Sequence, residues 1–162
     1  MSIQSSNKAV NQIERDLDRL AFQFFKMFSR TEYALKASGF NKGNGQADAD
    51  WEKFAAVVLP LVESPQTSEL ATAIDYILKH PPKKQMIKDG QLVWEDCKPS
   101  AQSEADLLLL YVRRVRNNLF HGGKFNGNWF APERNEKLLR CSLIVLAETR
   151  EYVADVKDAY DH

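Results

Sequence analysis

The sequence predicts an all-α fold, an up-and-down helical bundle with a small irregular or hairpin insertion. Two long stretches near the ends of the chain carry apolar residues at three- and four-residue steps, and shorter stretches of this kind lie between them. A chain of 162 residues is long enough to bury one core without disulfides or metal ions. We therefore expect a single helical domain over residues 1–162, with an insertion at 81–99.

The first helix is predicted from about Lys8 to about Ala37, where the glycines at 39, 43 and 45 end it. A second helix begins near Asp48 or Asp50, either of which can cap it, and stops around residues 60–65. A third, shorter helix begins at Ser68 and runs toward the two prolines at 81–82.

Residues 81–99 lose the helical period. The segment 85–94 reads as two short arms about the Asp89-Gly90 turn, which predicts a small hairpin. The next helix is expected from about Ser103, a suitable cap, to His121, with glycines after it. Pro132 suits the first turn of a last long helix, whose apolar positions continue to Val156.

Composition excludes several classes of protein. Lys plus Arg and Asp plus Glu both total 22, so the overall charge favours neither nucleic acid nor membrane. The two isolated cysteines, Cys97 and Cys141, argue against a zinc site and against a disulfide framework. The first seven residues lack the charged start and the long apolar run of a signal peptide, and Phe22 to Phe28 is too short and too interrupted to cross a bilayer. We expect a cytoplasmic protein without cofactor or metal.

The end of the helix at 103–121 carries the most informative polar residues. At helical spacing, Arg113, Arg116, Asn117 and Phe120 or His121 are expected to share one face beside the apolar stripe. One interpretation is a solvated face whose arginines complement the helix dipole while His121 caps carbonyls. The other is a site.

The segment from Arg116 to Gly122, Arg-Asn-Asn-Leu-Phe-His-Gly, resembles the signature of HEPN domains. In that family an Arg and a His are separated by four to six residues, and a polar residue, often Asn, follows the Arg. Here the separation is four. HEPN domains are also helical bundles with the motif near the end of the penultimate long helix. The stretch 81–99 has no counterpart in this comparison.

The resemblance implies a function. Many HEPN proteins are metal-independent ribonucleases, acting as toxins of toxin-antitoxin pairs or as antiviral defence effectors, and others are non-catalytic binding modules. RNA supplies its own nucleophile, the 2′-OH, so a catalyst needs a base, an acid and a cation for the phosphorane charge. By this resemblance His121 is the proton carrier, Arg116 binds phosphate and Asn117 orients the phosphate or the imidazole.

One chain offers a single histidine at this position, whereas the reaction uses both an acid and a base. HEPN nucleases form two-fold dimers, which implies a homodimer through the Arg116/His121 face, with Phe120 either at the interface or in the core. An antitoxin or a defence protein is the further partner implied. Some HEPN toxins carry a modified Tyr two positions after the His; here Gly123 stands there, with Phe125 the nearest aromatic residue.

Arg113, Arg114 and Lys124 are expected to extend the positive surface for RNA, although each alone also fits an ordinary surface charge. Glu32, near the end of the first helix, is a candidate to hold Arg116 or His121 through an ion pair.

The insertion carries a second basic cluster, formed by Lys83, Lys84 and Lys88 with Trp94 nearby. It fits either an RNA flank with stacking capacity or a solvated loop.

Three hypotheses remain. The first is a homodimeric metal-independent endoribonuclease; the second is a non-catalytic HEPN module that binds RNA, nucleotide or a protein partner. The third is a purely structural helical protein whose polar stripe is a solvated edge.

Overall fold

The computed structural model of the chain describes residues 3–122, 124–125, 128–129 and 131–162, with side chains for 9–122 and 131–162. Within these residues the protein is mostly helical, as predicted. Its helices are α1 (Ile3–Ala37), α2 (Trp51–Glu63), α3 (Ser68–Lys79), α4 (Glu104–Phe120), α5 (Pro132–Tyr152) and α6 (Ala154–Asp161). The described residues also form two antiparallel strand pairs. Strand β1 (Lys84–Lys88) pairs with β2 (Gln91–Glu95) between α3 and α4, and β3 (Lys124–Phe125) pairs with β4 (Asn128–Trp129) between α4 and α5.

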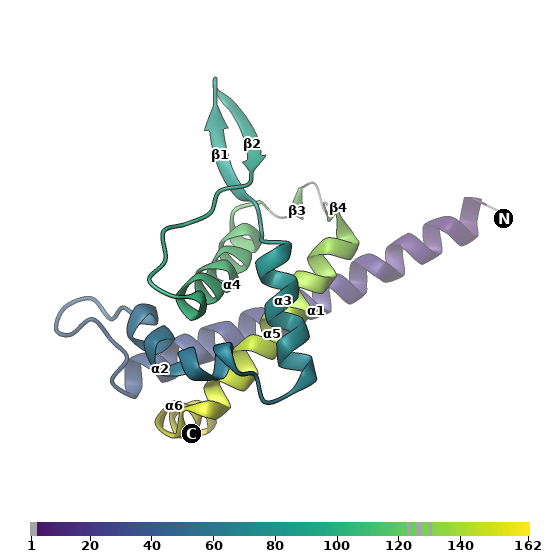
Figure 1. The fold of residues 1–162 in the computed structure, drawn as a ribbon. Helices are drawn as coiled ribbons and strands as arrows, with labels where there is room; N and C mark the ends of the chain where they lie inside the picture. Colours follow the sequence, from purple (N-terminus) through teal and green to yellow (C-terminus); the bar gives the residue numbers. More distant parts are fainter. Residues whose placement is uncertain (1–2, 123, 126–127, 130) are drawn as a thin grey trace.

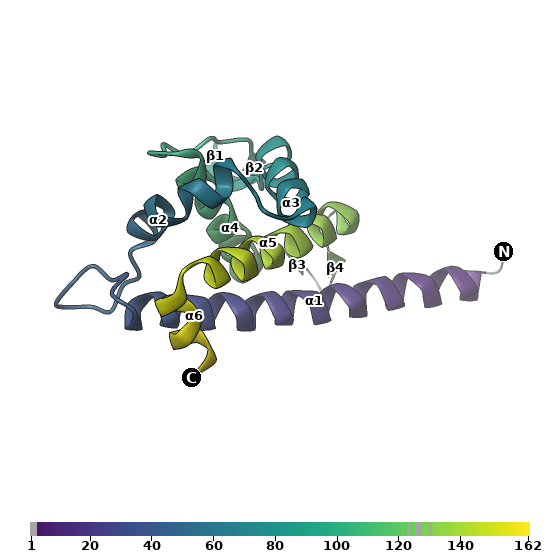
Figure 2. The same ribbon diagram turned by 60° about the horizontal axis from the view of Figure 1, so that its bottom comes forward.

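The helices pack in two groups. Helix α5 lies along α1 and α6 packs against α1, while α3 packs on α5 and α2 packs on α4 (Figures 1 and 2). The N-terminal part of α1 extends well beyond the other helices in both views. Every helix contributes at least one side chain that is less than 3% exposed to the shared core: Leu17, Phe24, Leu35, Phe54, Val58, Leu70, Ile77, Leu108, Val112, Leu139, Leu146 and Val156.

The predicted helix starts are confirmed by their caps. The carboxylate of Asp50 accepts from the backbone N–H of Lys53 at 3.0 Å. The Ser103 hydroxyl accepts from the backbone N–H of Asp106 at 3.1 Å. Pro132 occupies the first turn of α5, where its missing N–H leaves no helical hydrogen bond unmade. These contacts satisfy donors that a helix start otherwise leaves without partners.

The hairpin in the insertion is also confirmed. Asp89 and Gly90 have φ values of +50° and +75°, as a two-residue turn between antiparallel strands requires. The turn sets the register, so that Ile87 faces Leu92 and Lys84 faces Glu95. The hairpin projects from the bundle next to the C-terminal end of α4 (Figure 1).

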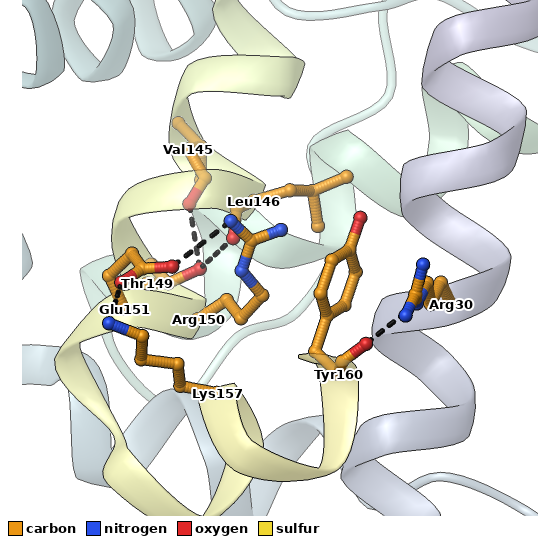
Figure 3. Close-up of polar contacts among 8 residues, drawn as sticks. All are labelled: Arg30, Val145, Leu146, Thr149, Arg150, Glu151, Lys157 and Tyr160. Atoms are coloured by element: carbon orange, nitrogen blue, oxygen red, sulfur yellow. Dashed lines mark hydrogen bonds and ion pairs between the residues drawn. The ribbon is translucent and has the colours of Figure 1, made fainter. Parts of the chain in front are cut away.

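The prediction of one last long helix is wrong at its end. Helix α5 ends before Val153, which has extended φ and ψ of −112° and 104°. Helix α6 then begins and packs against α1 and α5. Figure 3 shows the ring of Tyr160 between Arg150 and Arg30. Arg150 lies 3.9 Å from the ring centroid, and Nε of Arg30 donates to the Tyr160 carbonyl at 2.6 Å. These contacts stabilise the bend between α5 and α6, which the spacing of apolar residues does not predict.

Across the helices that the structure describes, none has the length and the apolar content needed to span a membrane.

Candidate functional site

The candidate site lies at the C-terminal end of α4, where the helix stops and the chain turns. The backbone N–H of His121 donates to the carbonyl of Asn117 at 2.9 Å, which closes the last helical turn. Gly122 follows with a φ of +107°, in the left-handed region that glycine adopts without strain. The helix therefore ends at a defined point, and the imidazole of His121 is exposed just beyond it.

A cavity of about 370 Å³ opens between this helix end and the base of the β1–β2 hairpin, and we call it the hairpin pocket. Its lining residues include cationic and amide side chains but no Asp or Glu. A concave site lined by one sign of charge concentrates ions of the opposite sign. The hairpin pocket therefore suits an anion. Its polar lining residues are Lys84, Gln85, Arg113, Arg114, Asn117, Asn118 and His121.

Arg116 faces a second cavity, of about 340 Å³, which we call the α1 pocket because α1 forms its other wall. The guanidinium lies over the rings of Phe28 and Phe120, with Cζ at 5.1 and 5.9 Å from their centroids. Stacking uses the face of a guanidinium and leaves its in-plane N–H groups for an anion. Asp18 and Phe25 line the same pocket.

The predicted shared face is thus divided between two pockets. Arg113, Asn117 and His121 line the hairpin pocket together, whereas Arg116 lines the α1 pocket. Helical geometry explains the division, since five residues turn through about 140° beyond a full circle. Within one chain, Arg116 and His121 therefore lie on different sides of the end of α4.

Arg114 and Asn118 hold the insertion in place. Nη1 of Arg114 donates to the carbonyls of Pro82 and Cys97, at 3.2 and 2.6 Å, and so ties both ends of the insertion to α4. Nδ2 of Asn118 donates to the carbonyl of Lys83 at 2.8 Å. The sequence did not predict this positioning role, because the carbonyl partners lie far from Arg114 and Asn118 along the chain. The prediction that Arg114 binds RNA stays a prediction.

Arg113, which lines the hairpin pocket, also lies near α2, with Cζ 6.0 Å from the ring centroid of Trp51. Glu32 accepts a 3.4 Å hydrogen bond from Nε1 of the same indole. Of the ion pairs among described residues, none joins Glu32 to Arg116 or His121, so the predicted partnership of Glu32 is wrong for this structure.

Three positions of the motif region lie partly or wholly beyond what is described. Gly123, where some HEPN toxins carry a Tyr, lies outside the described residues. Lys124 and Phe125 form β3, and their side chains lie outside the described part. The RNA-binding prediction for Lys124 therefore stays a prediction.

The basic cluster of the insertion is also divided. Lys84 and Gln85 line the hairpin pocket. The sequence named Lys84 as part of a candidate RNA flank but did not place it at the end of α4, and it did not assign Gln85. Lys88 forms an ion pair with Glu95, and Lys83 lies 4.0 Å from the carboxylate of Asp96. The only available signal was the position of Lys84 at the start of the first arm.

A larger cavity, of about 790 Å³, lies between the end of α3 and the start of α4, beside the two ends of the insertion. Its lining mixes Lys79, Lys98 and Arg114 with Asp96 and Glu104. Opposite charges there offset one another, so the lining defines no single ligand chemistry. The hairpin pocket, though smaller, has the clearer chemical character.

Among the residues that the structure describes, no three His, Cys, Asp or Glu side chains gather as potential metal ligands. The fold and site together define a helical protein with a cationic pocket at a helix end. No family model matches the chain, and no curated protein or solved structure is significantly similar to it.

Proposed function

We propose that this protein is a metal-independent endoribonuclease of the HEPN type. The observation that carries the proposal is the hairpin pocket, in which the exposed His121 stands among cationic and amide side chains with no carboxylate in the lining. Phosphate is one of the anions that such donors bind well, through charge-assisted hydrogen bonds to its oxygens. The Arg-x4-His spacing at the end of α4 adds support from the sequence.

The reaction needs no metal ion. A base takes the proton of the ribose 2′-OH, the 2′-oxygen bonds to phosphorus, and the P–O5′ bond breaks as an acid protonates the leaving 5′-oxygen. The products are a 2′,3′-cyclic phosphate and a 5′-hydroxyl. His121 is the proton carrier, Arg116 stabilises the phosphorane charge, and Asn117 orients the phosphate or the imidazole.

A homodimer through the C-terminal end of α4, which carries Arg116 and His121, is part of the proposal, since one chain holds these two side chains on different sides of that end. Exposed aromatic rings beside Arg116 support it. Phe25 and Phe120 are 43% and 57% exposed and lie 5.5 Å apart between centroids. Burying such rings against a second copy is favourable. An antitoxin or defence protein is a further proposed partner, and the cytoplasm is the proposed compartment.

Incubation of the purified protein with RNA in EDTA tests the proposal. We expect cleavage that Arg116→Ala and His121→Ala each reduce at least 100-fold, since each removes a group used in the transition state (about 10²–10⁴-fold for an acid or base). His162→Ala is the matched control, because it removes an exposed histidine at the end of α6. Absent cleavage, or cleavage unchanged in both variants, contradicts the proposal.

The second candidate is a non-catalytic HEPN module that binds RNA, nucleotide or a protein partner. The separation of Arg116 and His121 into two pockets favours it, because an isolated chain does not place both groups around one phosphate. This candidate predicts RNA binding that Arg116→Ala weakens, without strand scission by the wild-type protein.

A further inference from the structure

The base of the β1–β2 hairpin is fixed against the site. Arg114 and Asn118 of α4 hold carbonyls of the insertion, and Nη2 of Arg134 in α5 donates to the carbonyl of Pro81 at 2.7 Å. These hydrogen bonds from α4 and α5 fix the chain just before β1 and just after β2. The hairpin therefore has a defined position relative to His121, although it projects from the bundle (Figure 1).

This position brings two hairpin side chains to the pocket. Lys84 and Gln85, the first residues of β1, line it opposite Asn117 and His121. Gln85 lies beside the end of α4, since a Cβ on Gly122 would lie 3.4 Å from its Nε2, at the edge of ordinary van der Waals contact. The hairpin thus forms one wall of the hairpin pocket, and the end of α4 forms the other.

Lys84 differs from its neighbours in its charge balance. Lys83 lies 4.0 Å from Asp96, and Lys88 pairs with Glu95, the residue that faces Lys84 across the two strands. Within the described part of the chain Lys84 forms no ion pair, and its side chain is exposed. Of the three lysines in the basic cluster of the insertion, Lys84 is the one that lines the pocket and has no carboxylate partner among the described residues.

We infer that the β1–β2 hairpin is a substrate-binding arm, in which Lys84 and Gln85 bind a backbone phosphate of single-stranded RNA next to the one at His121. The inference rests on the proposed action on RNA. Lys84 supplies a charge and the amide of Gln85 a neutral donor. A cavity of about 370 Å³ falls at the small end of ligand sites, about 300–1,000 Å³, which suits one nucleotide.

Two residues of α4 act through the hairpin. Arg114 and Asn118 are positioning residues, which keep Lys84 and Gln85 at the pocket by holding the insertion. A hairpin of two strands has little stability alone, so its use as an arm depends on these anchors.

Fluorescence anisotropy in EDTA tests the inference, with a labelled single-stranded RNA that carries 2′-deoxyribose only at the positions of cleavage found for wild type, or with the unmodified RNA if no cleavage is found. The Kd is measured over a series of salt concentrations. Loss of one phosphate contact lowers the slope of log Kd against log salt by about 0.7 for a single strand. We expect Lys84→Ala to lower the slope by this amount and to weaken binding several-fold, and Gln85→Ala to weaken binding without changing the slope.

Lys88→Ala is the matched control. It removes the same charge from the same strand, but at the tip of the arm and away from the pocket lining. Its Kd and slope should stay close to wild type. Equal effects of Lys84→Ala and Lys88→Ala on the Kd and the slope, or no effect of either, overturn the inference. If the wild type cleaves RNA in EDTA, the proposed function stands even then. Binding that depends on Lys84 in a protein that never cleaves supports the arm and refutes the nuclease. Failure of the wild type to bind RNA overturns both.

Discussion

Replacing Arg114 with alanine should release the base of the hairpin. The substitution removes hydrogen bonds of 3.2 and 2.6 Å from Nη1 to the carbonyls of Pro82 and Cys97. A hydrogen bond to a charged group contributes about 1.5–3 kcal/mol. The two bonds share one nitrogen of a partly exposed side chain, so we expect a combined loss of about 2 kcal/mol. At about 1.4 kcal/mol per factor of ten, this raises the equilibrium constant for hairpin opening about 30-fold.

Hydrogen exchange measures this opening directly. Amides of β1 and β2 should exchange about 10- to 30-fold faster in Arg114→Ala than in the wild type, because an undocked two-stranded hairpin is marginally stable. Amides in the core of α1 and α5 should keep their rates. Arg113→Ala is the control, since Arg113 precedes Arg114 on α4 but lies near Trp51. The reasoning is refuted if hairpin rates stay within twofold of wild type, or rise equally in Arg113→Ala.

Three other predictions concern stability and thiol reactivity. Phe24→Ala removes a ring that is 0% exposed and should lower the free energy of unfolding by about 3–5 kcal/mol in urea titrations. Hydrogen bonds from Lys157 and then Arg150 lower the pKa of Glu151, so their contribution to α6 docking is present above the ordinary carboxylate pKa of about 4.3 and lost as the pH falls below it. In thermal melts over a range of pH, Glu151→Gln should therefore lose the part of the fall in Tm at low pH that protonation of Glu151 causes. A fall in Tm equal to that of the wild type contradicts this prediction. Burial raises the pKa of the Cys141 thiol, so iodoacetamide followed by mass spectrometry should label exposed Cys97 first.

The fold was predictable where local chemistry decides the structure. Asp50 and Ser103 cap their helices through their own side chains, and the Asp89-Gly90 turn alone selects the hairpin geometry. The break at Val153 was not predictable, because neither glycine nor proline marks it. It depends on contacts with α1, which apolar spacing along one helix does not report.

The site was predictable in part. The sequence identified the end of α4, and the hairpin pocket gathers Arg113, Asn117 and His121 as expected. The separation of Arg116 follows from helical rotation and was open to calculation. The contribution of Lys84 was not, since the sequence places this residue 37 positions before His121 and only the folded insertion brings the two to one cavity.

The central claim is that this helix end cleaves RNA through attack by the 2′-OH. Analysis of the product ends after incubation with RNA in EDTA tests it most directly. The proposed reaction yields 2′,3′-cyclic phosphates and 5′-hydroxyls, and these ends should disappear in His121→Ala. Intact RNA, or fragments that end in 3′-hydroxyls and 5′-phosphates, would contradict the claim.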